Sequence, residues 1–232
     1  MFNQNTIMVT GRLGADAEIK TLTNGKVATL SLAVDHNFKN RAGKWQTETS
    51  WFRIVTYLPW LIDNVLASEA TKGRMMFIHG ALRARAWEQD GKKMNIVEIE
   101  VDPTGGIVPI TADSPAMNMV HLAGRLGGHA DIKTLPGQDG GKVASFSLAA
   151  DRSYKDSAGQ WQNKTDWLRV VTFTPSLIDK VLAKTATKGR LMLVQGALRS
   201  REWADSDGEI RHSVEIEVDG AGGITPVLED KP

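Results

Sequence analysis

The chain contains a long internal repeat, which limits the folds available to it. Residues Gly11–Gly14 recur as Gly124–Gly127, a displacement of 113 residues. The displacement is 116 where Lys26–Ala28 matches Lys142–Ala144, because the second copy has a longer Gly-rich turn. A repeat of this kind is one structural unit made twice. Each copy is therefore expected to bury a core of its own.

The two copies account for nearly all of the 232 residues. Domains of just over 100 residues are of ordinary size. We therefore predict a first domain over residues 1–108, a linker over 109–116, a second domain over 117–228 and a short tail over 229–232. Pro109 and Pro115 are typical of such a linker.

Cysteine is absent, and the net charge is only +1. Without cysteine the chain has no disulfide and no thiol nucleophile, and it suits a reducing compartment. The first residues resemble no secretion signal, and no apolar run approaches the roughly 18 residues that span a bilayer. We expect a cytoplasmic protein with no membrane partner, whose binding depends on where its charges lie.

Apolar and polar residues alternate within each copy, which is typical of half-buried strands. In the first copy this pattern predicts strands over residues 6–13, 27–34, 51–56, 74–87 and 95–101. Apolar residues at helical spacing after Pro59, and again after Pro175, predict one short helix per copy. Five strands with a helix between the third and fourth form an OB barrel. The predicted fold class is all-β, with two tandem five-stranded OB-fold barrels.

Two strands of each copy are predicted to place aromatic and basic residues on one face, because side chains two residues apart point the same way. These residues are Trp51, Arg53, Tyr57, Arg83, Arg85 and Trp87, and in the second copy Trp167, Arg169, Phe173, Arg199, Arg201 and Trp203. Flat side chains stack on unpaired bases, and arginine meets phosphates or stacks as well. We interpret this face as a surface for single-stranded nucleic acid.

A tryptophan on a strand more often belongs to the core, and this alternative must be weighed. An arginine in phase with the tryptophan argues against it, because burying an unpaired charge is strongly unfavourable. The face is therefore predicted to be exposed to solvent, and a ligand or a subunit interface is expected to cover its aromatic residues. By the same alternation, acidic residues are expected on the solvated face of the last strand: Glu98, Glu100, Asp102, Glu215, Glu217 and Asp219.

These residues resemble those of the bacterial single-stranded-DNA-binding proteins. The similarity is carried by Val9–Gly14, Val27–Ala33, Thr49–Val55, Gly80–Trp87 and Lys164–Phe173. It implies stacking of DNA on Phe38, Trp51, Tyr57, Trp87, Tyr154, Trp167, Phe173 and Trp203. Phosphate or loop contacts are expected from Arg12, Lys39, Arg41, Lys44, Trp45, Arg53, Arg83, Arg85, Arg125, Lys155, Trp161, Lys164, Arg169, Arg199 and Arg201.

The resemblance implies sequence-independent binding and protection of single-stranded DNA in replication, recombination and repair. Four OB domains act together in that family, so a two-domain chain is expected to form a homodimer. The alternative is an OB-fold protein-interaction or replication-restart accessory module that binds nucleic acid weakly. Leu228–Asp230 resembles the acidic tail of that family only weakly, so recruitment of repair enzymes through a tail is not predicted.

The sequence predicts a binding protein and not an enzyme, with neither cofactor nor metal. Its histidines lack metal-ligand spacing; they are His36, His79, His121, His129 and His212. The turn Gly137–Gly141 lacks the Lys-Ser/Thr of a phosphate loop. Stacking does not separate DNA from RNA, and the resemblance alone favours DNA.

Overall fold

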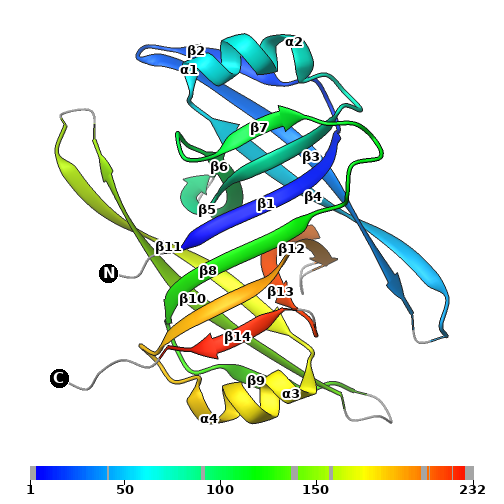
Figure 1. The fold of residues 1–232 in the computed structure, drawn as a ribbon. Coiled ribbons are helices and arrows are strands. Elements are labelled where there is room, and N and C mark those ends of the chain that lie inside the picture. The colour runs from blue at the N-terminus through cyan, green and yellow to red at the C-terminus, as the bar shows by residue number, and fades with distance from the viewer. Residues whose placement is uncertain are drawn as a thin grey trace.

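The computed structural model of the chain describes residues 4–40, 42–89, 92–136, 141–156, 159–204, 208, 210–220 and 222–227. Two β-barrels lie at opposite ends of the molecule, and each carries one short helical segment at its outer end (Figure 1). The barrels correspond to the two copies of the repeat. The predicted tandem OB-fold class is confirmed.

The first barrel consists of β1 (Asn5–Leu13), β2 (Glu18–Leu22), β3 (Gly25–Lys39), β4 (Trp45–Thr56), β5 (Met75–Gln89), β6 (Lys92–Val101) and β7 (Gly106–Pro109). The second consists of β8 (Asn118–Leu126), β9 (Asp131–Thr134), β10 (Lys142–Lys155), β11 (Trp161–Thr172), β12 (Leu191–Ala204), β13 (Ile210–Val218) and β14 (Gly223–Pro226). The long strands are the five predicted for each copy. The short strands β2, β7, β9 and β14 were not predicted, and they extend the sheet beside β3, β5, β10 and β12.

A helical segment connects β4 to β5, as predicted, and begins at Pro59. It runs through α1 (Pro59–Leu61), a π-helical turn η1 (Ile62–Leu66) and α2 (Ala67–Glu69), and its equivalent is α3 (Pro175–Leu177), η2 (Ile178–Leu182) and α4 (Ala183–Thr185). Its apolar side packs on the barrel core, where Ile62 and Leu66 are buried. In the described part of the chain, no helix is long and apolar enough to cross a membrane.

The two barrels are joined through their first strands. β1 pairs with β8 in antiparallel fashion, with Ile7 opposite Val120 and Met8 opposite Met119. Ile7 and Val120 are equivalent positions of the repeat, so an approximate two-fold axis relates the barrels. Pairing across this axis produces one continuous layer, β14–β12–β8–β1–β5–β7, at the front of Figure 1.

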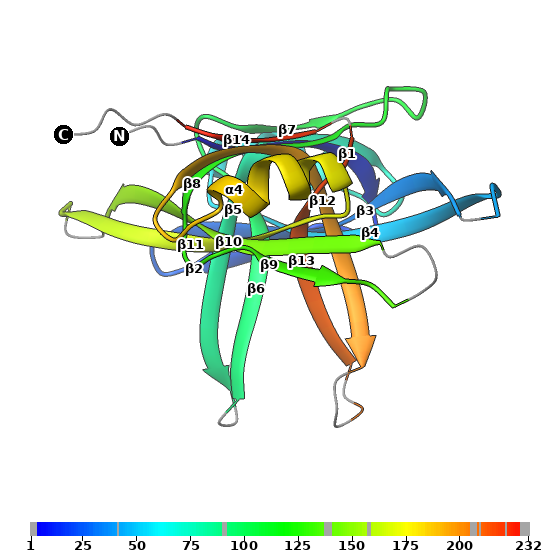
Figure 2. The ribbon, with the colours of Figure 1, turned by 90° about the horizontal axis from the view of Figure 1, so that it is seen from below.

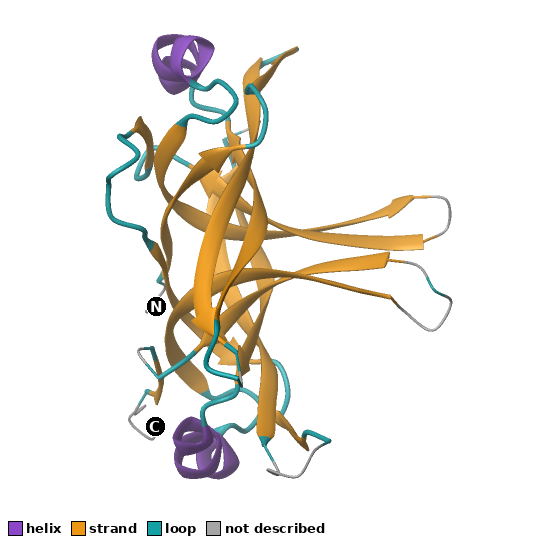
Figure 3. Cartoon of the chain, turned by 90° about the vertical axis from the view of Figure 1, so that its right-hand side faces the viewer, coloured by secondary structure: helices purple, strands orange, loops and turns teal. Residues whose placement is uncertain are grey.

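Two long hairpins form arms that reach out on opposite sides of the body (Figure 2). β3 pairs with β4 as far as Lys39 and Trp45, and β10 pairs with β11 as far as Lys155 and Trp161. The predicted strands 27–34 and 51–56 were shorter, because the outer arm is solvated on both faces and shows no apolar alternation. The hairpins β5–β6 and β12–β13 project side by side from another face (Figure 3).

The linker predicted over residues 109–116 begins inside the first barrel. Pro109 is the last residue of β7, which pairs with β5, and the Ile110 amide donates a hydrogen bond of 3.0 Å to the Met75 carbonyl. The predicted tail, residues 229–232, lies outside the described residues.

Candidate nucleic-acid interface

A half-exposed tryptophan lies at the centre of each predicted binding face. Trp51 on β4 is 51% exposed, and Trp167 on β11 is 53% exposed. The Trp51 ring packs against Gly14, where an added Cβ would lie 2.5 Å from the ring atom Cζ3. Gly127 contacts Trp167 in the same way. Each ring is thus supported by backbone on one side and open to solvent elsewhere, which suits base stacking.

Two arginines lie beside each tryptophan, held by one carboxylate. Arg53 is 3.5 Å from Glu98, and Arg85 forms a second ion pair with the same carboxylate. The second domain repeats the set as Arg169, Arg201 and Glu215. The shared carboxylate orients both guanidinium groups, and in the second domain Arg201 also pairs with Glu217 at 2.7 Å.

The expectation that these carboxylates are solvated is wrong for Glu98 and Glu215. Glu98 is only 3% exposed, and Glu215 is similarly buried. Closure of the barrel places β6 parallel to β4 and β13 parallel to β11. The arginines of the neighbouring strands then cover the acidic face, which alternation along one strand does not reveal.

The second aromatic residue of each face is also exposed and contacts an arginine. Arg85 donates a hydrogen bond of 3.0 Å to the Tyr57 hydroxyl. Arg201 lies 5.6 Å from the centre of the Phe173 ring. These contacts connect the stacking residues to the basic ones within each face.

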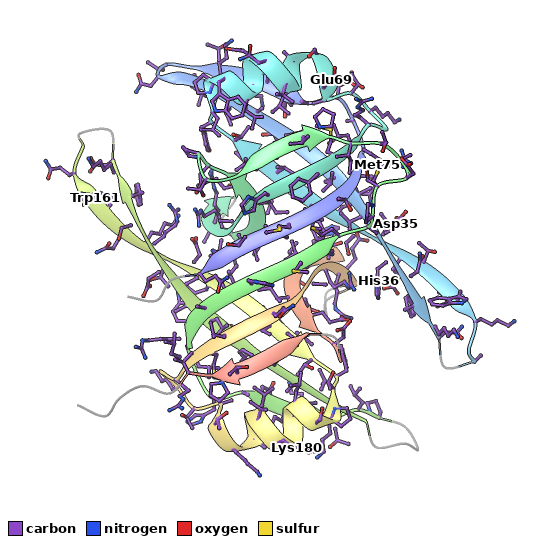
Figure 4. The ribbon with its side chains drawn as sticks, in the orientation of Figure 1. Asp35, His36, Glu69, Met75, Trp161 and Lys180 are labelled. Carbon is purple, nitrogen blue, oxygen red and sulfur yellow. The ribbon has the colours of Figure 1, made fainter. Side chains whose placement is uncertain are left out.

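Each arm carries an exposed tryptophan with a lysine over its ring. Trp45 and Trp161 are 70% and 69% exposed, and Lys39 and Lys155 lie 5.2 and 5.3 Å from their ring centres. Figure 4 shows Trp161 on the arm, well away from the body of the barrel. Lys44 and Lys164 are exposed on the arms as well. Arg41 and the side chains of Trp87 and Trp203 lie outside the described residues.

Arg12 on β1 and Arg125 on β8 hold the turns that precede β5 and β12. Each guanidinium is exposed and donates a hydrogen bond to the carbonyl of a turn glycine, Gly73 at 3.1 Å and Gly189 at 3.0 Å. Ala33 pairs with both Arg12 and Trp51, and Ala149 pairs with both Arg125 and Trp167, so each arginine shares a face of the sheet with a tryptophan, across one intervening strand.

Arg83 does not lie on the open face predicted for it. Its side chain is 11% exposed and lies at a joint between the domains, 3.2 Å from Glu100 and 3.9 Å from Asp166 of the second domain. Arg199, its equivalent, is half-buried at the other joint, 2.9 Å from His36 Nδ1 of the first domain. Both arginines lie partly buried against residues of the other copy, and no pattern within one copy could indicate these contacts.

The two joints use different residues at equivalent positions. At the first, where β4 meets β12, the Ser200 amide donates to Ser50 Oγ at 3.1 Å. At the second, where β11 meets β5, the Ala84 amide donates to Asp166 Oδ1 at 3.1 Å, and Arg152 Nε donates to Asp166 Oδ2 at 3.0 Å. Asp166 is fully buried. The second joint thus contains ion pairs around Asp166, whereas the first contains a hydrogen bond between two serines and one from Arg199 to His36.

His36 is held in its neutral form at the first joint. Its burial, and then the nearby Arg199 guanidinium, lower the pKa of His36, although Glu217, Glu48 and Asp219 oppose the shift. Arginine is only a donor, so Nδ1 accepts the hydrogen bond and the imidazole is unprotonated there. The sequence allows this histidine to be judged only by metal-ligand spacing, which cannot indicate its contact with Arg199 of the other domain.

Comparison with known sequences assigns the family. A sequence model of the single-strand binding protein family matches residues 4–105 and again residues 117–222. The chain belongs to this family. The two matches correspond to the two barrels, and the resemblance inferred from the sequence is confirmed. A protein-interaction module, the alternative function, is not favoured.

Two solved structures share the arrangement of both family domains. The single-stranded DNA binding protein of Thermus aquaticus is 21% identical, with a TM-score of 0.76 over 100% of this chain and 97% of that one. A deletion mutant of that protein is 23% identical, with a TM-score of 0.75 over 99% and 97% of the two chains. At this identity the likeness concerns the fold.

Proposed function

We propose that the protein binds single-stranded DNA without regard to its sequence, and protects it during replication, recombination and repair. The observation that carries the proposal is the repeated open face of tryptophan, arginine and a second aromatic residue, one on each OB domain. Stacking contributes about 1–3 kcal/mol per base and does not select among bases. Membership of the single-strand binding protein family supports the same function.

The test is binding of a fluorescently labelled oligo(dT) at two salt concentrations. Trp51→Ala and Trp167→Ala should each weaken binding by about 5- to 150-fold, which is the loss of about 1–3 kcal/mol of stacking. Trp60→Ala is the control, because Trp60 is equally exposed but lies on the helical segment. Binding by the wild-type protein should also weaken with salt, because phosphate contacts release counterions.

Two outcomes would contradict the proposal. One is the absence of oligo(dT) binding by a folded wild-type protein, and the other is binding that does not respond to salt. If Trp51→Ala unfolds the protein, the tryptophan is part of the core and the face has been assigned wrongly. Thermal unfolding of each variant separates this result from a loss of binding.

We further propose that two chains associate, so that four OB domains act together. The outer face of the layer β14–β12–β8–β1–β5–β7 supports this proposal. Met8 and Met119 are exposed there, opposite each other beside the two-fold axis, and Val108 is exposed on β7. Such a face suits an isologous contact between identical chains. A solution mass equal to that of one chain would exclude it.

A further inference from the structure

A groove straddles the two domains beside the second joint. It has a volume of about 490 Å³ and is lined by Arg85 and Ala86 of the first domain and by Arg152, Tyr154 and Lys164 of the second. We call it the basic groove, because three of these five residues are cationic. A strand of DNA passing from one domain to the other meets residues of both domains at this place.

The equivalent groove at the first joint differs in charge. It is larger, about 760 Å³, and its lining includes His36 with three glutamates and three arginines: Glu48 and Arg53 of the first domain, and Arg199, Arg201, Glu202 and Glu217 of the second. We call it the mixed groove. Glu48 stands where Lys164 stands in the repeat, and the neutral His36 stands where Arg152 stands. The two crossings between the domains are therefore electrostatically unlike.

The strand register shows that this difference in charge lies at two pairs of directly opposed residues. Arg152 lies directly opposite Lys164 on β10 and β11, whereas His36 lies directly opposite Glu48 on β3 and β4. Two cations placed opposite each other destabilise a sheet unless an anion lies near. Asp166 pairs with Arg152, but no described residue forms an ion pair with Lys164. The basic groove thus keeps positive charge that an anionic ligand would stabilise.

The basic groove also offers a stacking surface. The Arg152 guanidinium lies 5.2 Å from the centre of the exposed Tyr154 ring, so charge and an aromatic face occur side by side. In the mixed groove, Trp51 and Phe173 provide aromatic surface, but Glu48, Glu202 and Glu217 balance the three arginines of the lining.

We propose that the basic groove is a phosphate subsite where single-stranded DNA crosses between the two domains, and that the mixed groove, whose arginines are balanced by glutamates, holds the phosphates less strongly at the other crossing. The proposal rests on the function proposed above and adds to it the place where the DNA crosses between the domains. The two crossings are then unequal, although the stacking residues match, because the described residues that line the basic groove include no carboxylate to balance its cations.

The test compares three exposed residues by neutralising each charge in turn. Lys164→Gln removes the cation of the basic groove. Lys180→Gln makes the same charge change on the helical segment at the far end of the second domain (Figure 4). Glu48→Gln removes one of the three glutamates of the mixed groove. Each variant is titrated over a series of salt concentrations with an oligo(dT) of about 30 nucleotides, longer than the roughly 4–16 nucleotides that one OB fold binds.

Each phosphate neutralised on a single strand contributes about −0.7 to the slope of log K against log salt. Lys164→Gln should make the slope shallower by about 0.7 and lower the affinity about fivefold at about 0.1 M salt. Lys180→Gln and Glu48→Gln should leave the slope unchanged. Equal slopes for the two lysine variants would overturn the proposal, as would a fivefold gain in affinity for Glu48→Gln. If the wild-type protein itself fails to bind, the proposed function has failed, and that result is distinct from either of these.

Discussion

The contact between Trp51 and Gly14 makes a prediction that separates binding from folding. An alanine at position 14 would place its Cβ 2.5 Å from Cζ3 and 2.9 Å from Cη2 of the tryptophan ring, closer than carbon atoms can approach. The ring must move in Gly14→Ala, and it can do so because half of its surface already faces solvent. The tryptophan remains in the chain but leaves its supported position.

The expected change in affinity follows from the stacking contribution of one base. Loss of about 1–3 kcal/mol corresponds to about 5- to 150-fold weaker binding of oligo(dT). The free energy of unfolding should change by less than about 1 kcal/mol, because alanine restricts the unfolded chain and so offsets the lost contact between ring and backbone. Binding should therefore fall while stability hardly changes.

Oligo(dT) titration and urea unfolding of the same samples measure both quantities. Gly128→Ala is the control, because an added Cβ there meets no atom within 4 Å. Gly127→Ala should repeat the effect of Gly14→Ala at Trp167. The reasoning is refuted if Gly14→Ala binds normally while Trp51→Ala binds weakly, because the backbone support would then be irrelevant to stacking.

Two further predictions concern the joints. Asp166→Ser should lower the free energy of unfolding by about 3 kcal/mol, measured in urea, because it removes a fully buried carboxylate that pairs with the partly buried Arg152 and Arg83. The loss should be only about 1 kcal/mol for Ser50→Ala, which removes a neutral hydrogen bond. Comparable losses for the two variants would show that the ion pairs stabilise the second joint no more than a neutral hydrogen bond stabilises the first. At the first joint the pKa of His36 in the folded protein lies below its unfolded value of about 6.5. The unfolded chain therefore binds the proton first as the pH falls. The free energy of unfolding should decrease as the pH drops from about 6.5 through the folded pKa. Urea unfolding between about pH 8 and pH 5 should show this component in the wild type and not in His36→Gln, and an identical pH profile for both would exclude the histidine as its source.

Much of the fold and of the open faces follows from the sequence alone. The repeat required two domains of one kind, and alternation along each strand identified the exposed Trp51 and Trp167 without any knowledge of the fold in space. These features are local, because the period of a strand decides which way each side chain points. The paired glycines at positions 14 and 127 were visible in the repeated motif, although their contact with the tryptophans was not.

Only the tertiary structure decided what the charged residues do. Closure of each barrel brought arginines over Glu98 and Glu215 and buried them, and pairing of β1 with β8 brought Arg83 against Asp166. These partners are far apart in the sequence, and within one copy nothing distinguishes a solvated charge from one that the other copy neutralises. The repeat therefore predicts two equal domains, whereas the contacts between them make the two crossings unequal.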